Sequence, residues 1–560
     1  MLFLGTEKYP VENHYGKFIS EHGGSKNAGT SFLTTYYYFD IANEHLHTAS
    51  DIFSQFFKCP LFTEEAVERE INAVDSEFRK NYQLDSRKLY QVFKSHAANP
   101  LSHFSKFQTG NLEYLSKPGI RDALIKFHSE YYSSDIMNLC IYGKESIEDL
   151  EKLAIETFED VENKNVKLED RSEPHPFPLE TLGKLFKIVP SKDIRKLSIK
   201  WILPDTKQLY KVKPGNYISQ ILGHEGPNSL LGYLIREGLV TELSSSFDHV
   251  LDACDYFTVS VTLTEEGEEN YQKVMRIIFA AVNHLKEQDL KKYIFEEEQT
   301  MNKISFENEV KQKAISTTRH LAGRIKKLVD RNISMDQLLY YPYILEDFDE
   351  EAIKSHINEM KAHKTIVMFT TKKHHTKTDQ IEVVYNTDFS CEDISQEFLD
   401  ELDKITFEDI ESKEEVMHKY KFDYPPKNEF IPYNTEIMKA DTLQEFDKLD
   451  TSTFKNCTLW FKMDDKFDQP KVNVKAILRT NDLDHRINAK SKVFKNLWSS
   501  LARENLREFA YCASLAQIHY SLSTNVEGVT FSFHGFNDGI QNFIKEVMKL
   551  SSTRDQSFDQ

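Results

Sequence analysis

One pattern occurs three times along the chain, and this repeat constrains the fold more than any other feature. Each copy has a helix, a small or polar stretch, a strongly β-patterned strand and an amphipathic helix. The strands are expected at residues 35–41, 256–261 and 529–533. The flanking helices are expected at 15–21 and 44–57, at 230–237 and 268–282, and at 501–508 and 540–550. Such repeated blocks predict an α+β fold of repeated α/β domains, each with a mixed sheet packed against helices.

Breaks in the repeat divide the chain into domains. A length of 560 residues suggests about three or four domains. A proline-rich segment at 173–178 ends the first domain, and an acidic run at 388–415 follows the second. We therefore expect a first domain at 1–173, a second at 174–400, a linker at 401–430 and part of a third at 431–560. A third domain of matching size would need about a hundred more residues.

The composition excludes several classes of protein. The net charge is −19, so the chain lacks the basic surface that general nucleic-acid binding requires. No stretch approaches the roughly 18 apolar residues of a membrane span. The six cysteines are scattered without a Cys-x-x-Cys pair, which is typical of thiols in a reducing compartment. We expect a cytoplasmic protein, while a mitochondrial or peroxisomal location stays open.

The helix expected at 63–82 carries the most suggestive carboxylates. Its buried stripe is expected to consist of Val67, Ile71, Val74 and Phe78. Glu70 and Glu77 lie beside that stripe, seven residues and so about two helical turns apart. Two carboxylates so placed could hold a divalent cation, or they could simply reach solvent at the boundary of an apolar face.

Longer motifs carry a resemblance to a known family. They lie at residues 1–10, 20–28, 69–77, 103–111, 223–227 and 427–432. Together they resemble the pitrilysin, or insulinase, family of zinc peptidases, and its insulin-degrading type in particular. The resemblance covers essentially the whole chain and corresponds to the N-terminal half of such a peptidase, from just after its His-x-x-Glu-His motif. It implies two nearly complete homologous domains that form a half-shell, plus part of a third.

The resemblance also implies a zinc site. Glu77 would be a zinc ligand and Glu70 a supporting carboxylate. In this family two imidazoles and one carboxylate hold a single zinc, and the glutamate of His-x-x-Glu-His activates its bound water. The chain contains neither His-x-x-Glu-His nor His-Glu-x-x-His. We therefore expect the general base and both histidines upstream of Met1, which predicts a truncated chain with an incomplete zinc site, inactive alone.

Two segments are expected to hold a peptide substrate. The first is the strand through Asn27 and Ala28, to which a substrate adds as a further β-strand in this family. From the residues alone, the same segment could be an ordinary hairpin rim. Gly29 stands where the insulin-degrading type has an aromatic residue, so this chain lacks that side-chain contact.

The second segment resembles an exosite that anchors the N-terminus of a substrate. Its residues here would be Gly223, Glu225, Leu243, Ser244 and Ser245. A carboxylate such as Glu225 forms a charge-assisted hydrogen bond with an α-amino group. The motif at 223–227 could equally be a turn that opens a helix. The neighbouring positions that depart from a family pattern richer in histidine and glycine are Asn216, Ser219 and Gln220.

These features predict a zinc-dependent metalloendopeptidase that degrades peptides in a closed chamber. The expected partners are peptide substrates and either the missing C-terminal half or a homologous subunit, and a homo-oligomer stays open. The alternative is a non-catalytic homologue that binds peptides or a partner subunit. A pure scaffold would not need Glu70 and Glu77 at zinc-site spacing.

Overall fold

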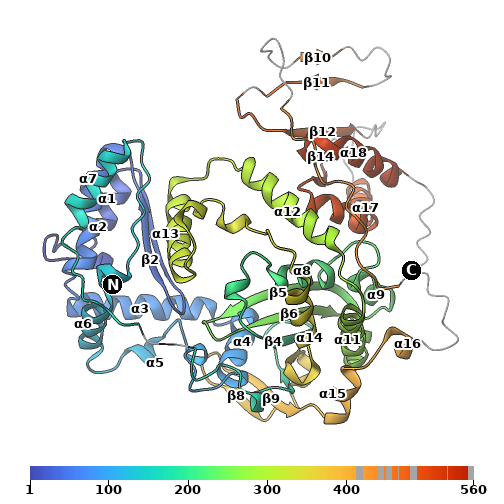
Figure 1. The fold of residues 1–560 in the computed structure, drawn as a ribbon, viewed down its shortest axis with the longest axis horizontal. Coiled ribbons are helices and arrows are strands. Elements are labelled where there is room, and N and C mark those ends of the chain that lie inside the picture. The colour runs from blue at the N-terminus through green and yellow to red at the C-terminus, as the bar shows by residue number, and fades with distance from the viewer. Residues whose placement is uncertain are drawn as a thin grey trace.

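The computed structural model describes residues 1–168, 170, 172–410, 421–437, 447–449, 457–464, 466–479, 489–525 and 528–552. Parts of the expected linker, at 411–420, and of the C-terminal end, at 553–560, lie outside the described residues. In the described part of the chain, no helix has both the length and the apolar character needed to cross a membrane. Figure 1 shows an N-terminal region rich in helices, a central region built on a large sheet and a C-terminal region beside it.

The N-terminal region packs helices around one two-stranded antiparallel sheet. Ile52, Phe53 and Phe56 lie on one face of a helix and pack against Tyr15 in an aromatic core. The elements are α1 (His14–Glu21), β1 (Ser25–Thr30), β2 (Thr35–Asp40), α2 (Leu46–Lys58), α3 (Glu64–Asn81), α4 (Asp85–Val92), α5 (Leu112–Leu115), α6 (Ile120–Tyr131) and α7 (Ile147–Phe158).

The helix expected at 63–82 is α3, and Thr63 precedes its first turn. Of its predicted stripe, Val67 and Phe78 are buried. Ile71 and Val74 are only half-buried. The apolar face is therefore the one predicted, but the described residues cover only part of it.

A seven-stranded mixed sheet organises the central region. Its strand order is β5-β6-β4-β7-β3-β9-β8, and only β3 and β7 pair in parallel. The strands are β3 (Lys184–Ile188), β4 (Lys196–Leu203), β5 (Val240–Val250), β6 (Cys254–Leu263), β7 (Thr365–Thr370), β8 (Gln380–Glu382) and β9 (Thr387–Asp393). The helices are α8 (Pro214–Leu222), α9 (Leu230–Arg236), α10 (Glu265–Glu269), α11 (Tyr271–Glu287), α12 (Lys292–Glu307), α13 (Ala314–Asp330), α14 (Glu350–Glu359), α15 (Gln396–Leu402) and α16 (Phe407–Ile410).

Both faces of this sheet are covered, and β7 is buried at every position. The strands β4 and β6 are apolar on one face and place polar side chains such as Ser198 and Ser260 on the other. Leu197, Ile199 and Trp201 alternate along β4 toward a core shared with α8, α9, α11 and α14. The opposite face packs on Phe93, which follows α4 of the N-terminal region. Asp85, the first residue of α4, accepts the backbone N–H groups of Ser191 and Lys192 at 2.5 and 2.9 Å. The two regions therefore share one hydrophobic core and are also joined by the two hydrogen bonds to Asp85.

The C-terminal region has a three-stranded sheet of order β12-β14-β13 under two helices. Its core includes Met301 and Ile304 of α12, so it is docked on the central region. Asn428, within the motif at 427–432, donates its side-chain N–H to the Cys512 carbonyl at 2.7 Å and strengthens that junction. The elements are β10 (Asp447–Leu449), β11 (Leu459–Phe461), β12 (Lys471–Arg479), α17 (Ala489–Leu515), β13 (His519–Thr524), β14 (Gly528–Phe536) and α18 (Asn537–Ser552).

The threefold repeat is confirmed, with one correction. Each predicted strand is the second strand of an antiparallel hairpin: β2, β6 and β14. A further strand precedes it in all three copies: β1, β5 and β13. The repeat pattern did not include these strands, although the family resemblance implied one through Asn27 and Ala28. Each first strand lies at an edge of its sheet. Pairing with a strongly patterned partner offsets the weak β-propensity of the small and polar residues in these segments, such as Asn27 in β1 and Ser244 in β5.

Candidate functional site

A cavity of about 470 Å³ lies between α8 and the edge strand β5. This is within the usual size range of ligand pockets. Residues of α12 and α17 complete its wall, so three segments of the central region and one of the C-terminal region meet there. The lining residues are Gly215, Asn216, Ser219, Gln220, Gly223, Glu225, Leu243, Ser244, Ser245, Phe247, Glu298 and Tyr511.

Two glycines let α8 approach β5 closely. A Cβ atom on Gly215 would lie 2.3 Å from the Phe247 ring. One on Gly223 would lie 2.2 Å from Ser245 Oγ and 2.7 Å from the carbonyl oxygen of Ser219. Any larger residue at Gly223 must therefore push the strand or the helix aside, which would change the shape of the cavity.

The strand side of the cavity follows the pleat of β5. Leu243 is buried and Ser245 and Phe247 are half-buried, while the intervening Ser244 is exposed. The Oγ atoms of Ser219 and Ser245 lie 2.6 Å apart, which joins helix and strand. Because β5 is the last strand of the sheet, no strand in the described part of the chain pairs with its outer side. An extended peptide could pair there by β-augmentation.

Two carboxylates reach the cavity, and both are half-buried. Burial raises the pKa of Glu225, while the positive charge of Arg507 opposes this. Burial also raises the pKa of Glu298, and hydrogen bonds from Asn216 and Gln220 partly compensate. The cavity therefore holds two partly desolvated carboxylates, whose charged forms a positively charged group would stabilise.

The C-terminal region contributes an aromatic wall. The Tyr511 hydroxyl donates to the Gly223 carbonyl at 3.4 Å. The Tyr511 ring meets the buried His224 ring edge-on, with centres 4.8 Å apart. His224 Nδ1 accepts the N–H of Gly226 at 3.0 Å, which fixes the turn that carries Glu225. Burial lowers the pKa of His224 to about 4, so this ring is neutral at pH 7.

All five predicted exosite residues line this one cavity: Gly223, Glu225, Leu243, Ser244 and Ser245. Their role in holding a substrate stays a prediction. Sequence reasoning missed Glu298 and Tyr511. Each is a single residue within a long helix, and no local pattern distinguishes it from other surface positions.

The second predicted substrate segment, Asn27 and Ala28, lies in β1. Asn27 is exposed, and its side-chain oxygen accepts the N–H of Ala28 at 2.8 Å. A Cβ atom on Gly29 would meet the Tyr36 ring on β2, so a larger residue there must displace that side chain. α13 lies beside β2 (Figure 1), with the Arg319 guanidinium 5.8 Å from the centre of the Tyr38 ring.

The carboxylates predicted for zinc stand on α3. Glu77 is exposed. Glu70 Oε1 lies 3.1 Å from the amino nitrogen of Met1. Within the described residues, neither belongs to a set of three histidine, cysteine or carboxylate side chains close enough to share a metal ion. The residues present do not fit the predicted zinc site, which takes three protein ligands.

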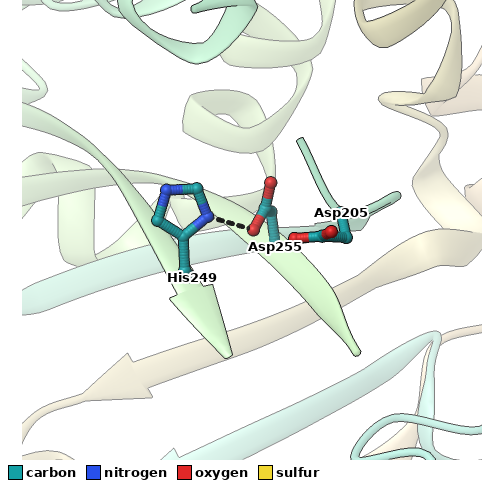
Figure 2. Close-up of side chains that lie close together, drawn as sticks. All are labelled: Asp205, His249 and Asp255. Carbon is teal, nitrogen blue, oxygen red and sulfur yellow. Dashed lines mark hydrogen bonds and ion pairs between the residues drawn. The ribbon is translucent and has the colours of Figure 1, made fainter. Parts of the chain in front are cut away.

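Over the same described residues, one such set does occur: Asp205, His249 and Asp255, whose ligand atoms lie within 4.8 Å of one another (Figure 2). Asp255 is fully buried and already bonded. One oxygen is 2.6 Å from His249 Nδ1, and the other accepts from the Thr206 N–H and hydroxyl at 2.8 and 2.7 Å. Burial and the charge of Asp255 raise the pKa of Asp205. Asp255 of β6 is therefore hydrogen-bonded both to His249 of β5 and to Thr206 in the segment after β4.

Three family models match the chain. The model for insulinase, peptidase family M16, matches residues 1–101. The model for the peptidase M16 inactive domain matches residues 120–302, and that for the middle or third domain of peptidase M16 matches residues 306–560. The three matches follow one another in the order expected for one family.

Individual relatives agree with these models. The chain is 37% identical to the insulin-degrading enzyme of Homo sapiens, over 99% of this chain and 53% of the relative. A relative from Schizosaccharomyces pombe whose name describes a zinc protease is 33% identical, over 98% of this chain and 56% of the relative. The chain thus spans about half the length of the curated relatives it matches. In fold it is similar to crystalline pitrilysin, with a TM-score of 0.80 and 24% identity over 100% of this chain and 57% of that one.

Proposed function

Because the chain belongs to the insulinase family, peptidase family M16, we propose that it supplies the peptide-binding part of a metalloendopeptidase of the insulin-degrading type. One observation carries this proposal. An edge strand with a free outer side and a half-buried carboxylate, Glu225, face the same cavity. That combination suits the N-terminal end of a peptide better than a small neutral ligand.

The peptide would bind through two kinds of contact. Its backbone pairs with the outer side of β5 near Ser244, because an edge strand offers unpaired N–H and C=O groups. Its α-amino group pairs with Glu225, which is half-buried and has no ion-pair partner within 4.0 Å among the described residues. In the N-terminal region, Asn27 and Ala28 on β1 form a second strand to which a longer substrate can add.

Hydrolysis needs more than these residues provide. The 560 residues contain no His-x-x-Glu-His, and among the described residues Glu77 belongs to no set of three metal-ligand side chains, which a zinc site of this family requires. We therefore propose that these residues alone neither hold zinc tightly nor cleave peptides. The chemistry would come from a protein in which the ligand set is complete, with a C-terminal half or a homologous subunit as partner.

The second candidate is a non-catalytic homologue that binds peptides. The contrast between a well-formed cavity at Glu225 and an incomplete ligand set at Glu77 favours it over a pure scaffold. Both candidates require peptide binding at β5. The two candidates are distinguished by whether the full-length protein hydrolyses the peptide in a chelator-sensitive manner. A cytoplasmic location is proposed for both.

Peptide affinity tests the shared step. A fluorescent peptide with a free N-terminus should bind more tightly than its acetylated form, by about 1–3 kcal/mol, because acetylation removes the charge that pairs with Glu225. Glu225→Gln should abolish that difference. Glu242→Gln is the matched control, since Glu242 is an exposed carboxylate on β5 outside the cavity lining. Equal affinities of the wild type for free and acetylated peptides would remove the exosite proposal.

A further inference from the structure

The wall opposite β5 carries a carboxylate that the exosite prediction did not include. Glu298 projects from α12 into the cavity. Its Oε1 accepts a hydrogen bond from Asn216 Nδ2 at 2.9 Å, and Gln220 hydrogen-bonds it as well. Asn216 and Gln220 are four residues apart on α8, so they present their amides on one face of that helix. Two neutral donors therefore hold the Glu298 side chain in place without bringing a positive charge to it.

The cations near these carboxylates are bonded elsewhere. Lys213 attracts Glu298, yet its Nζ donates to the Pro342 carbonyl at 3.1 Å. Arg507 attracts Glu225, yet its guanidinium pairs with Glu504 at 3.0 Å. Across the described part of the chain, no ion pair within 4.0 Å involves Glu225 or Glu298. The cavity therefore presents two half-buried carboxylates, each without a direct cationic partner.

A ligand with one positive charge satisfies only one of these carboxylates. The other then stays half-buried and uncompensated, which is unfavourable. A peptide with a basic residue next to its N-terminus carries two cations, the α-amino group and a flexible side chain. Since lysine and arginine stems are apolar, they can lie along the Leu243 and Phe247 side of the cavity while the charged end reaches a carboxylate.

We propose that Glu298 makes this cavity selective for peptides with lysine or arginine at the first or second position, pairing with that side chain while Glu225 pairs with the α-amino group. This selectivity rests on the proposed binding of peptide N-termini at β5. Asn216 and Gln220 are positioning residues in this arrangement.

The experiment compares a short peptide with arginine at the second position and the same peptide with citrulline there. Citrulline keeps the shape and removes the charge. The 560-residue chain should bind the arginine peptide about tenfold more tightly, as expected for one charge-assisted pair. Glu298→Gln keeps the hydrogen bonds to Asn216 and Gln220 and should remove the arginine preference. It should leave the preference for free over acetylated N-termini intact.

Glu225→Gln should show the opposite pattern, keeping the arginine preference and losing the acetylation effect. Glu296→Gln is the matched control, because Glu296 is an exposed carboxylate on the same helix outside the cavity lining. An arginine preference that persists in Glu298→Gln, or that is absent in the wild type, overturns this proposal while peptide binding at β5 stands. Failure of every peptide to bind overturns the proposed function and this selectivity together.

Discussion

The β1–β2 and β5–β6 hairpins have the same order of elements but differ in what surrounds their outer strands. Each hairpin follows a short helix and leads into a longer one, α1 and α2 in the first case and α9 with α10 and α11 in the second. β1 and β2 form a sheet of two strands, whereas β5 and β6 end a sheet of seven. A helix, α8, lies against β5 and encloses a cavity with it.

Because of this difference, both hairpins can pair with a peptide backbone, but the surroundings of β5 can also select among peptides. Both β1 and β5 offer a free edge, so both can accept a peptide backbone. The strand β5 also shares a cavity with charged and aromatic side chains from three further segments, at Glu225, Glu298 and Tyr511. A hairpin alone thus provides sequence-independent pairing, and selectivity arises where other segments close around it. The following experiments test that contrast from the largest expected effect to the smallest.

The largest effect, on local stability, is expected from substituting the aspartates that hydrogen-bond within the two hairpins. Asp255 of β6 is buried and bonds His249 and Thr206, whereas Asp40 of β2 is half-buried and accepts the Ser25 N–H and hydroxyl at 2.6 and 2.7 Å. Asp255→Ala leaves buried donors unpaired and should lower the local stability by about 3 kcal/mol. Asp40→Ala should cost about 1 kcal/mol, because water replaces the lost acceptor.

Hydrogen–deuterium exchange measures both effects, since it gives the free energy of opening for each hairpin separately. Asp205→Ala serves as the control, because Asp205 lies close to Asp255 but is exposed and takes no part in the hydrogen bonds of Asp255 to Thr206 and His249. Equal losses of opening free energy for Asp255→Ala and Asp40→Ala would show that the seven-stranded sheet does not stabilise its hairpin more than the two-stranded sheet does.

A smaller effect, on the pH dependence of stability, is expected from His224, the buried histidine between the cavity residues Gly223 and Glu225. His224 has a pKa of about 4, lowered by burial from its ordinary value of 6.5. Between these values the unfolded chain binds a proton that the folded chain excludes, so stability falls as the pH drops from 6.5 toward 4. From pH 7 to pH 5 this amounts to about 2 kcal/mol for one such group.

Urea denaturation of the wild type and His224→Gln at both pH values isolates this contribution. The variant should lose about 2 kcal/mol less than the wild type on acidification. In the N-terminal region, burial also lowers the pKa of His128, so His128→Gln should act in the same direction. A wild type and a His224→Gln variant with the same dependence on pH would contradict a neutral, buried His224.

The sequence predicted the repeated framework because its signals are local. The strand at 256–261 and the helix at 268–282 are apolar in the right period, and they appear within β6 and in α10 and α11. The outer strands β1, β5 and β13 were not expected from pattern alone, because small polar residues lack β-propensity. Their structure depends on the partner strand, which is a tertiary effect.

The cavity was predicted in part for the same reason. Gly223, Glu225 and the Leu243 segment came from the family resemblance, since their motif is contiguous. Glu298 meets Asn216 across 82 residues, and Tyr511 meets Gly223 across 288 residues. Likewise, Asp205, His249 and Asp255 stand singly at strand ends. Contacts of this kind are set by packing between segments and leave no mark on the local sequence.

The smallest effect is expected at Glu77, the carboxylate that sequence reasoning ranked first for chemistry. Glu77 is exposed on α3 and, over the described residues, no set of metal-ligand side chains includes it. Glu77→Gln should therefore change the free energy of unfolding by less than about 0.5 kcal/mol, the usual size for a surface substitution. Zinc content after dialysis, measured by elemental analysis, should be far below one per chain in the wild type and unchanged in the variant. Glu298→Gln is the informative counterpart, because it should alter peptide selection while leaving zinc content unchanged. One tightly held zinc per wild-type chain, lost in Glu77→Gln, would instead place a working metal site on α3 and would shift the chemistry from the β5–β6 hairpin to the N-terminal region.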